Sequence, residues 1–265
     1  QNLQTTTMTS PRALIALLLV LFSPQVLLAF RIVNGTQVDI RNRPYQVSVQ
    51  TYPGTADAEF YGGGSIIGPN WVLTAAHLFR GFVRLSWIGV RVGSSYDYEG
   101  GTVIDVTGMT IHPRYNRRNK DFDFALLRLT RPYTVDPIAR PITMVATGAV
   151  DVADGTVCTV SGWGDTLGTA DWDHLRLLDV PIVNHDLCRE NYAESRLTIT
   201  KNMLCAGYDE GLRDACTGDS GGPLVCNGLL VGVVSWGKGC AQPDYYGVYA
   251  DVEKARDWIK NKTGI

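Results

Sequence analysis

The sequence predicts an all-β protein that ends in one amphipathic helix. Three features support this fold class: short stretches alternate polar and apolar residues, turn-forming residues separate them, and glycine is abundant where charge is scarce. Of the 265 residues, 28 are Gly and 19% are charged. The hydrophobic content of 45% excludes a disordered chain, and a formal net charge of -2 offers no basic surface for nucleic acid.

The N-terminal segment has the pattern of a leader. Residues 13–22 (ALIALLLVLF) form an apolar run after Arg12, and a small residue follows at Ala29. The run is too short to cross a bilayer core about 30 Å thick, whereas a basic flank and a small residue are typical of a secretory signal peptide. We therefore expect a leader and signal peptide over residues 1–29 and a secreted, extracellular protein. A buried core helix is the alternative interpretation.

Strand candidates are spread along the rest of the chain. Residues 46–51 (QVSVQT) alternate polar and apolar side chains, as a strand with one buried face does. Residues 68–70 (GPN) and Asn227-Gly228 each stand between apolar stretches, so each predicts a hairpin. Further strands are expected at residues 103–106, 124–129, 157–160, 178–183 and 224–226.

A helical pattern is found only at the C-terminus. Asp251 can cap its first turn, and Gly264 follows its last. Four apolar residues share one helical face: Val252, Ala255, Trp258 and Ile259. We therefore expect a single amphipathic helix at the end of the chain.

The cysteines predict disulfides rather than a metal site. An even number in an exported protein is typical of disulfides, here three of them, although spacing alone allows 15 pairings. None stands at metal-ligand spacing from another Cys or a His, so we expect no zinc site. The six positions are Cys158, Cys188, Cys205, Cys216, Cys226 and Cys240.

The motif GDSGGP at residues 218–223 has the composition of a nucleophile site. Its glycines carry no Cβ, so successive N–H groups can point at one place, as an oxyanion requires. Ser220 stands among them as a candidate nucleophile, but a hydroxyl reacts poorly without a neighbouring base. A glycine-rich turn without catalytic function is the alternative interpretation.

Two further motifs supply a candidate base and its partner. His77 ends TAAH, and Asp123 begins DFALL, whose apolar residues would bury its carboxylate. A buried carboxylate needs a partner such as an imidazole N–H, and carboxylate, imidazole and hydroxyl in series activate a serine. The other histidines are interpreted as structural or solvated: His112, His174 and His185.

With these motifs the chain closely resembles the chymotrypsin-like serine endopeptidases, specifically the trypsin type. The resemblance covers residues 32–265, and the order His, Asp, Ser distinguishes it from subtilisin-like and α/β-hydrolase enzymes. It implies two packed antiparallel six-stranded β-barrels with a C-terminal α-helix and an active site in the cleft between the barrels. Beyond the three motifs, it rests on IVNG at Ile32, SGWG at Ser161 and SWG at Ser235.

The resemblance implies roles for the motif residues. Ser220 would be the nucleophile, His77 the base and then the acid, and Asp123 the group that orients the imidazole. The N–H groups of Gly218 and Ser220 would form the oxyanion hole. The resemblance also implies three disulfide pairs: Cys158–Cys226, Cys188–Cys205 and Cys216–Cys240.

The resemblance further implies a pocket for a cationic side chain. Asp214 matches the floor of that pocket, and Gly237 and Gly247 match its walls. A carboxylate at the end of a narrow apolar slot favours a cation, because its desolvation must be compensated. Ala215 stands beside this Asp where trypsin has Ser, so we expect Arg to be preferred over Lys. The remaining substrate-binding residues are Ser235 and Trp236.

Arg31 and Ile32 match the family's activation site. Cleavage after Arg31 would free the Ile32 amine to pair with Asp219, which would order the oxyanion hole and the pocket. Residues 30–31 would then be a short propeptide and residues 32–265 the protease domain. A surface Arg before a strand is the alternative interpretation.

Two departures from the family pattern affect stability and metal binding. Leu78 and Gly62 stand where the family usually has a disulfide beside the catalytic His, and its absence predicts a loss of about 2–4 kcal/mol. The usual calcium loop would fall at residues 93–101, but it is short and has Ser94 in place of an acidic ligand. We therefore expect no metal and no cofactor.

The sequence as a whole predicts a secreted, digestive serine endopeptidase that cleaves after Arg or Lys. Its partners would be protein or peptide substrates and protein inhibitors of proteases. We expect a monomer that binds neither nucleic acid nor membrane. One alternative is a protease-fold binding protein without activity, which would typically have lost a triad residue or an oxyanion glycine. Another is chymotrypsin-like or elastase-like specificity, which Asp214 disfavours.

Overall fold

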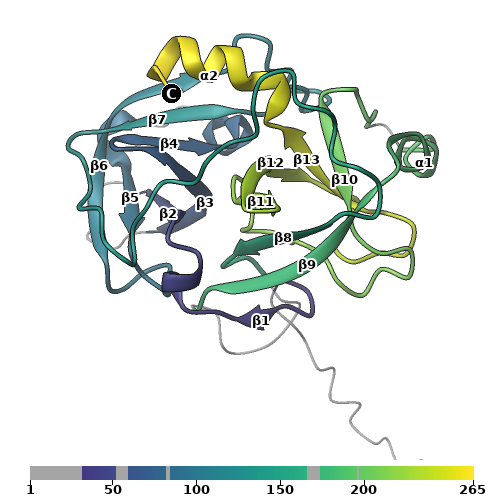
Figure 1. Ribbon diagram of the computed structural model, residues 1–265, viewed down its shortest axis with the longest axis horizontal. Coiled ribbons are helices and arrows are strands. Elements are labelled where there is room, and N and C mark those ends of the chain that lie inside the picture. The colour runs from purple at the N-terminus through teal and green to yellow at the C-terminus, as the bar shows by residue number, and fades with distance from the viewer. Residues whose placement is uncertain (1–31, 52–58, 82–83, 166–173, 196) are drawn as a thin grey trace, which may run out of the picture.

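Two β-barrels lie side by side and make up most of the protein (Figure 1). This arrangement confirms the expected all-β class with two six-stranded antiparallel barrels. The computed structural model describes residues 32–51, 59–81, 84–165, 174–195 and 197–265.

The first barrel closes in the strand order β2-β3-β4-β7-β6-β5, with β5 pairing back onto β2. Thr74 at the end of β4 lies opposite Ala125 at the start of β7. The segment that follows β4 therefore lies beside the segment that precedes β7. The strands are β2 (Gln46–Thr51), β3 (Glu59–Gly68), β4 (Trp71–Thr74), β5 (Ile88–Val92), β6 (Thr102–Ile111) and β7 (Ala125–Leu129).

The second barrel closes in the order β8-β9-β10-β13-β12-β11, with β11 pairing back onto β8. A short strand, β1 (Thr36–Gln37), pairs with the start of β9. Asn227 and Gly228 form the turn between β11 and β12, as the sequence predicts. The strands are β8 (Val157–Gly162), β9 (Arg176–Val183), β10 (Met203–Ala206), β11 (Pro223–Cys226), β12 (Leu229–Trp236) and β13 (Gly247–Asp251).

The helices differ from the expectation of a single C-terminal helix. The described residues contain α1 (His185–Asn191) as well as α2 (Arg256–Thr263), so that expectation was wrong. Asn184 caps α1 by accepting from the N–H groups of Asp186 and Leu187. This capping residue is a local helix signal that does not depend on an apolar face. No helix in the described part of the chain is long and apolar enough to cross a membrane.

The C-terminal segment crosses from the second barrel to the first. Asp251 does not cap α2; it ends β13 and accepts from the N–H of Glu253 at 3.0 Å, where a 3-10 turn begins. The helix α2 starts only after that turn and buries Ile259 completely. Its Trp258 ring lies 4.7 Å from the ring of His112, which follows β6 of the first barrel.

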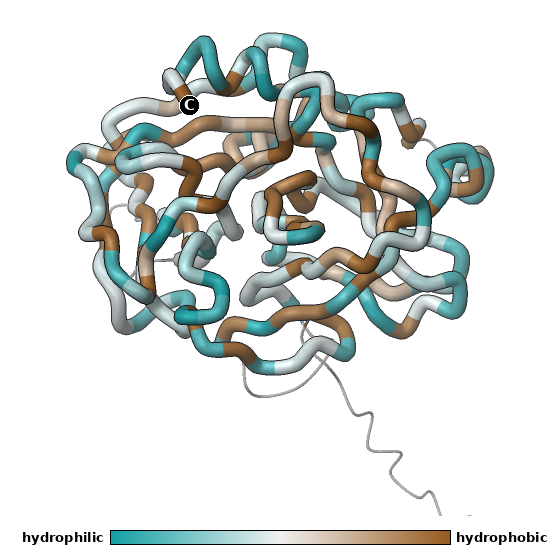
Figure 2. The backbone as a smooth tube through the Cα atoms, in the orientation of Figure 1, coloured by the Kyte–Doolittle hydropathy of each residue, from teal (hydrophilic) through white to brown (hydrophobic). Residues whose placement is uncertain are grey.

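One hydrophobic core runs through both barrels. Val47 and Leu126 of the first barrel and Val160 and Val233 of the second are fully buried members of the same cluster. Figure 2 shows hydrophobic residues along the strands and hydrophilic residues on the outer turns. The continuous core supports the segments that line the junction between the barrels.

The structure contains three disulfides, which are the pairs that the resemblance implies. Cys158–Cys226 joins β8 to β11, Cys188–Cys205 joins α1 to β10, and Cys216–Cys240 joins two loops. These bonds use all six cysteines of the sequence, and all lie in the second half of the chain. The first barrel therefore contains no disulfide.

Candidate active site

Three predicted residues from separate segments meet at the junction of the barrels. His77 lies in the 3-10 helix η2 (Ala76–Phe79) after β4, and Asp123 lies just before β7, so strand pairing sets them side by side. Ser220 lies in the turn before β11. His77 Nδ1 lies 2.6 Å from Asp123 Oδ2, and His77 Nε2 lies 2.9 Å from Ser220 Oγ. The three groups therefore stand in the order carboxylate, imidazole, hydroxyl.

The Asp123 carboxylate sets the tautomer of the imidazole. It is fully buried and also accepts from the backbone N–H of His77 at 2.8 Å and from Ser235 Oγ at 2.5 Å. A carboxylate can only accept, so His77 Nδ1 carries the proton and Nε2 is left to accept from the Ser220 hydroxyl. The sequence predicted only a substrate-binding role for Ser235. The hydrogen bond from Ser235 to Asp123 was not predicted.

Two backbone N–H groups of the turn that carries Ser220 are not used within the described part of the chain. The N–H groups of Gly218 and Ser220 bond to no acceptor in the described part of the chain, whereas that of Gly221 donates to Val234 O at 2.9 Å. The turn depends on glycine at two places. Gly218 has φ of 99° and Gly221 has φ of 84°, in the left-handed region, and a Cβ on Gly221 would also clash with Thr74. Backbone N–H groups that are left free beside a nucleophile are the donors that a developing oxyanion requires.

A cavity of about 200 Å³ is lined by both Ser220 and Asp214. The Asp214 side chain is buried; its Oδ2 accepts from the N–H of Ala241 at 3.0 Å, while its Oδ1 has no partner among the described residues. Burial raises the pKa of Asp214 to about 7, against the lowering effect of hydrogen bonds from backbone N–H groups. A buried, incompletely paired carboxylate favours a cationic ligand that can compensate its desolvation.

The cavity walls contain both predicted and unpredicted residues. A Cβ on Gly247 would lie 2.8 Å from Asp214 Oδ1, so a larger residue there would crowd the carboxylate. Besides Ser220 and Asp214, the predicted substrate-binding residues that line the cavity are Ala215, Ser235, Trp236, Gly237 and Gly247. Sequence reasoning missed other lining residues, among them Lys120, Thr217, Val234 and Tyr249. Lys120 stands in no motif, and only the closure of the barrels brings it to the cavity.

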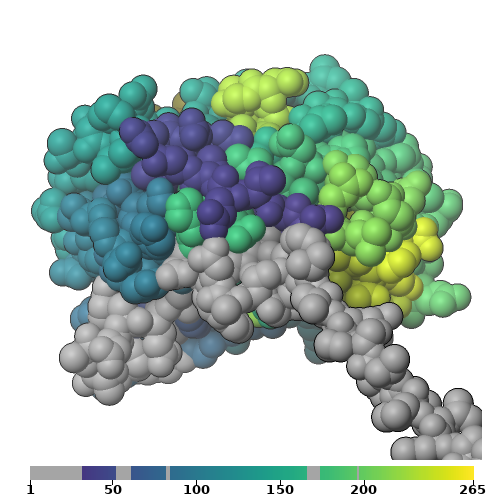
Figure 3. All heavy atoms as spheres, turned by 90° about the horizontal axis from the view of Figure 1, so that it is seen from below, coloured from purple at the N-terminus to yellow at the C-terminus, as the bar shows by residue number. Residues whose placement is uncertain are grey.

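Ile32 and Asp219 are both fully buried beside this site. The first described residues lie across the face where the barrels meet (Figure 3), and Val33 forms an isolated β-bridge with Asp214. Asp219 accepts from the N–H of Gly164 at 2.8 Å and from that of Cys216 at 2.9 Å. Burial raises the pKa of Asp219 to about 7. The predicted cleavage residue Arg31 lies outside the described residues.

The motif SGWG packs directly against Asp219. A Cβ on Gly164 would lie 2.6 Å from Asp219 Cγ, and a Cβ on Gly162 would lie 3.1 Å from the same atom. Glycine is therefore needed at both positions to leave space for the buried Asp219 carboxylate. The sequence identified the motif, and the structure supplies its physical reason.

Comparison with known proteins agrees with this geometry. The family profile of trypsin matches residues 32–259. The chain belongs to the trypsin family. It is 42% identical to Trypsin 5G1 of Aedes aegypti, over 89% of this chain and 86% of that protein. It is 41% identical to Trypsin-2 of Salmo salar, over 86% of this chain and 94% of that protein. It is 42% identical to Trypsin of Simulium vittatum, over 92% of this chain and 99% of that protein. The trypsin-family chain is thus a serine endopeptidase that acts on protein or peptide substrates.

Proposed function

We propose that this trypsin-family endopeptidase is secreted, cleaves after Arg or Lys with Arg preferred, and is made as a zymogen that cleavage after Arg31 activates. The observation that carries the specificity is the buried Asp214 carboxylate, whose Oδ1 lacks a partner among the described residues, at the end of a cavity beside Ser220. In this proposal residues 1–29 are the leader and signal peptide, residues 30–31 the propeptide and residues 32–265 the protease domain.

The proposed chemistry is that of the family. Ser220 Oγ attacks the substrate carbonyl while His77 Nε2 takes its proton, and the imidazolium then donates that proton to the leaving amine. Asp123 stabilises the imidazolium through the 2.6 Å contact with Nδ1. The free N–H groups of Gly218 and Ser220 bind the oxyanion. Water then attacks the acyl-enzyme while His77 takes its proton, and the imidazolium returns that proton to Ser220 Oγ as the acyl group leaves.

The proposed specificity follows from charge and size. An Arg or Lys side chain entering the cavity would bring its positive charge to Asp214 Oδ1, which has no other partner in the described chain. A phenylalanine side chain would leave that carboxylate desolvated and unpaired, which costs binding free energy. Asp214 therefore supports trypsin-like over chymotrypsin-like or elastase-like specificity.

The proposed activation step uses the buried Asp219. This carboxylate accepts hydrogen bonds from backbone N–H groups, and burial raises its pKa, so a nearby cation would stabilise its charged form. Cleavage after Arg31 would create such a cation at Ile32, which is already buried and whose neighbour Val33 forms a β-bridge with Asp214. An ion pair between the Ile32 amine and the Asp219 carboxylate would order the adjoining turn at Gly218.

The test combines activation with three matched substrates. The protein cleaved after Arg31 should hydrolyse Arg and Lys esters and leave the Phe ester almost untouched, whereas the Arg31→Gln protein should be secreted but inactive. Preference for the Phe ester would overturn the specificity, and full activity of uncleaved Arg31→Gln protein would overturn the activation step. A properly cleaved protein that hydrolyses none of the esters would favour the inactive binding protein instead.

A further inference from the structure

Two tripeptides of the sequence match the acceptor motif for N-linked glycosylation: Asn34-Gly35-Thr36 and Asn261-Lys262-Thr263. The motif is short and also occurs in segments that carry no glycan, whereas a modified Asn lies on a surface loop of an exported protein. The first copy lies in the turn that enters β1, and the second lies in α2. Their surroundings in the structure therefore distinguish them.

Asn34 stands at an exposed turn. The N–H of Gly35 donates to Ile32 O at 2.5 Å, which closes the turn, and Asn34 has φ of 66°. Asn is one of the few residues other than Gly that adopt this left-handed conformation readily. Asn34 and Thr36 are both exposed, and neither side chain forms a hydrogen bond in the described part of the chain. Both groups of the acceptor motif are therefore accessible.

The turn is fixed to the second barrel on both sides. Before it, Ile32 and Val33 are buried, and Val33 O accepts from the N–H of Asp214 at 3.3 Å. After it, β1 pairs with β9. Asn34 is thus an exposed position between buried neighbours, and a glycan attached to its side chain would leave the burial of Ile32 unchanged.

The second motif lies in regular helix. Asn261 is exposed, but Thr263 Oγ1 donates to Ile259 O at 2.8 Å and accepts from the N–H of Ile265 at 3.1 Å. The hydroxyl of this motif is therefore occupied within the helix. Ile259 is fully buried, so the same turn of α2 is also docked on the core.

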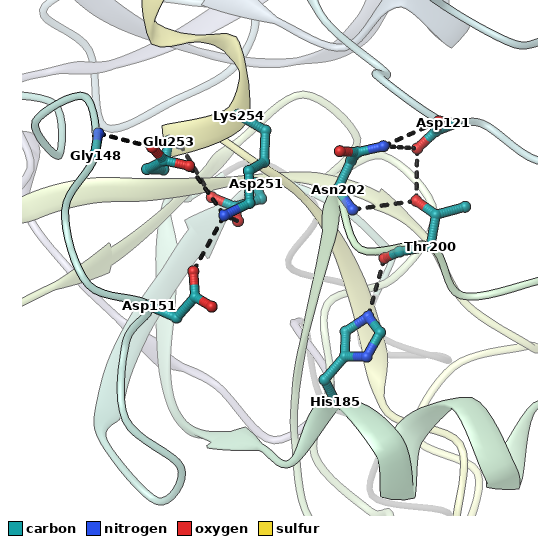
Figure 4. Close-up of polar contacts among 9 residues, drawn as sticks. All are labelled: Asp121, Gly148, Asp151, His185, Thr200, Asn202, Asp251, Glu253 and Lys254. Carbon is teal, nitrogen blue, oxygen red and sulfur yellow. Dashed lines mark hydrogen bonds and ion pairs between the residues drawn. The ribbon is translucent and has the colours of Figure 1, made fainter.

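The start of this helix is anchored as well (Figure 4). In the 3-10 turn that leads into α2, Lys254 Nζ lies 3.1 Å from Asp151 Oδ1 and 2.9 Å from Glu253 Oε2. Glu253 Oε1 accepts from the N–H of Gly148 at 2.8 Å. Anchored at its start and along its buried face, α2 holds the second motif in a helical backbone rather than in a loop.

We propose that Asn34, and not Asn261, carries an N-linked oligosaccharide. The co-reactant is an oligosaccharide carried on a lipid diphosphate. Asn34 Nδ2 forms a bond to the anomeric carbon of the sugar while the bond from that carbon to the phosphate oxygen breaks. The amide loses one proton, and the lipid diphosphate leaves. This inference rests on the proposed secretion, because an exported chain is the one that meets this class of sugar donor.

The test is expression of the full chain in a eukaryotic cell, followed by treatment of the secreted protein with a peptide N-glycosidase. The treated protein should lose mass. Asn34→Asp, which also tolerates a left-handed backbone, and Thr36→Ala should each abolish that loss. Thr36→Ser keeps the acceptor motif and should retain the loss of mass, and Asn261→Gln is the matched control that should leave it unchanged.

Three outcomes would contradict the proposal in different ways. A secreted protein whose mass does not change on treatment would overturn the glycan at Asn34 alone, and so would a loss of the mass change in Asn261→Gln. After cleavage, the parent protein and Thr36→Ala should hydrolyse an Arg ester with equal kcat/KM. A large gain in Thr36→Ala would show that the glycan disturbs the burial of Ile32. A chain that stays in the cytosol with residues 1–29 attached would instead overturn the proposed secretion.

Discussion

The side chain of Leu78 fills the space that a side chain on Gly62 would need. A Cβ on Gly62 would lie 2.8 Å from Leu78 Cδ1 and 2.6 Å from the backbone oxygen of Ser220. The next residue, Gly63, donates its N–H to that same Ser220 oxygen at 2.9 Å. Family members usually join the two positions by a disulfide, whereas this chain packs a leucine over a glycine. The packing links the His77 segment, β3 and the Ser220 turn.

Gly62→Ala should therefore destabilise the protein by about 1–3 kcal/mol, because the added methyl group overpacks a filled site. The free energy of unfolding, measured by urea denaturation of the uncleaved protein, checks this. Gly108→Ala is a matched control, since a Cβ there would lie 3.5 Å from its nearest neighbour, Arg128 Cβ. In a Leu78→Ala background the cost of Gly62→Ala should be smaller. An equal cost in both backgrounds would show that Leu78 is not the obstacle.

Ser220→Ala should abolish turnover and leave the binding of a basic-residue inhibitor largely intact. The change removes the nucleophile that lies 2.9 Å from His77 Nε2, but it leaves the cavity and Asp214 in place. Ester hydrolysis and calorimetric titration with a non-covalent benzamidine-type ligand measure the two properties separately. Near-native turnover would refute the assignment of the triad. Loss of ligand binding in a folded variant would show that Ser220 is needed for binding as well as for catalysis.

Asp214→Asn should stabilise the uncleaved protein above pH 7. Asp214 has a pKa of about 7 in the folded protein against a reference value of 3.8, so between these values the folded state holds a proton that the unfolded chain has released. The free energy of unfolding therefore falls as the pH rises from about 4 to about 7. Removing the charge should recover on the order of 2 kcal/mol at pH 8 and flatten this dependence.

Urea denaturation at pH 5 and pH 8 measures the effect of Asp214→Asn, with the exposed Asp257→Asn as control. Asp219, whose burial raises its pKa to about 7, should keep part of the pH dependence in the variant. After activation the same substitution should sharply reduce kcat/KM for Arg substrates. A variant with the stability profile of the parent at both pH values would contradict the buried charge at Asp214.

Ala215→Ser should narrow the preference for Arg over Lys. A guanidinium can pair with both oxygens of Asp214 in a fork, whereas the shorter lysine ammonium depends more on a neighbouring hydroxyl, which Ala215 lacks. We expect Arg to be favoured about tenfold in kcat/KM, equal to about 1.4 kcal/mol, and less after the hydroxyl is restored. Matched Arg and Lys peptides test this. Equal kcat/KM for the Arg and Lys peptides in the parent enzyme would mean that Ala215 does not set a preference between the two side chains.

Local patterns in the sequence accounted for much of the fold. The strand at residues 46–51 and the turn at Asn227-Gly228 were predicted correctly, because side-chain period and turn chemistry are properties of neighbouring residues. The expectation that this strand has a single buried face was wrong, because its polar side chains are buried as well as its apolar ones. Three buried strands, β5, β10 and β13, were missed. All five residues of β13 are buried, so no polar alternation marks it. The helix α1 was also missed, although the sequence contains its capping residue, Asn184.

By itself, the sequence determined the fold class, the family and the residue types that carry the chemistry, since motifs such as GDSGGP are contiguous in the chain. Only the tertiary structure decided which groups touch. His77 and Ser220 are 143 positions apart, and their 2.9 Å contact depends on the closure and packing of two barrels. The same closure brings Ser235 to Asp123 and Lys120 to Ser235. The contacts of Ser235 with Asp123 and of Lys120 with Ser235 have no local sequence signal, because they are fixed by strand register and loop anchoring between distant segments rather than by neighbouring residues.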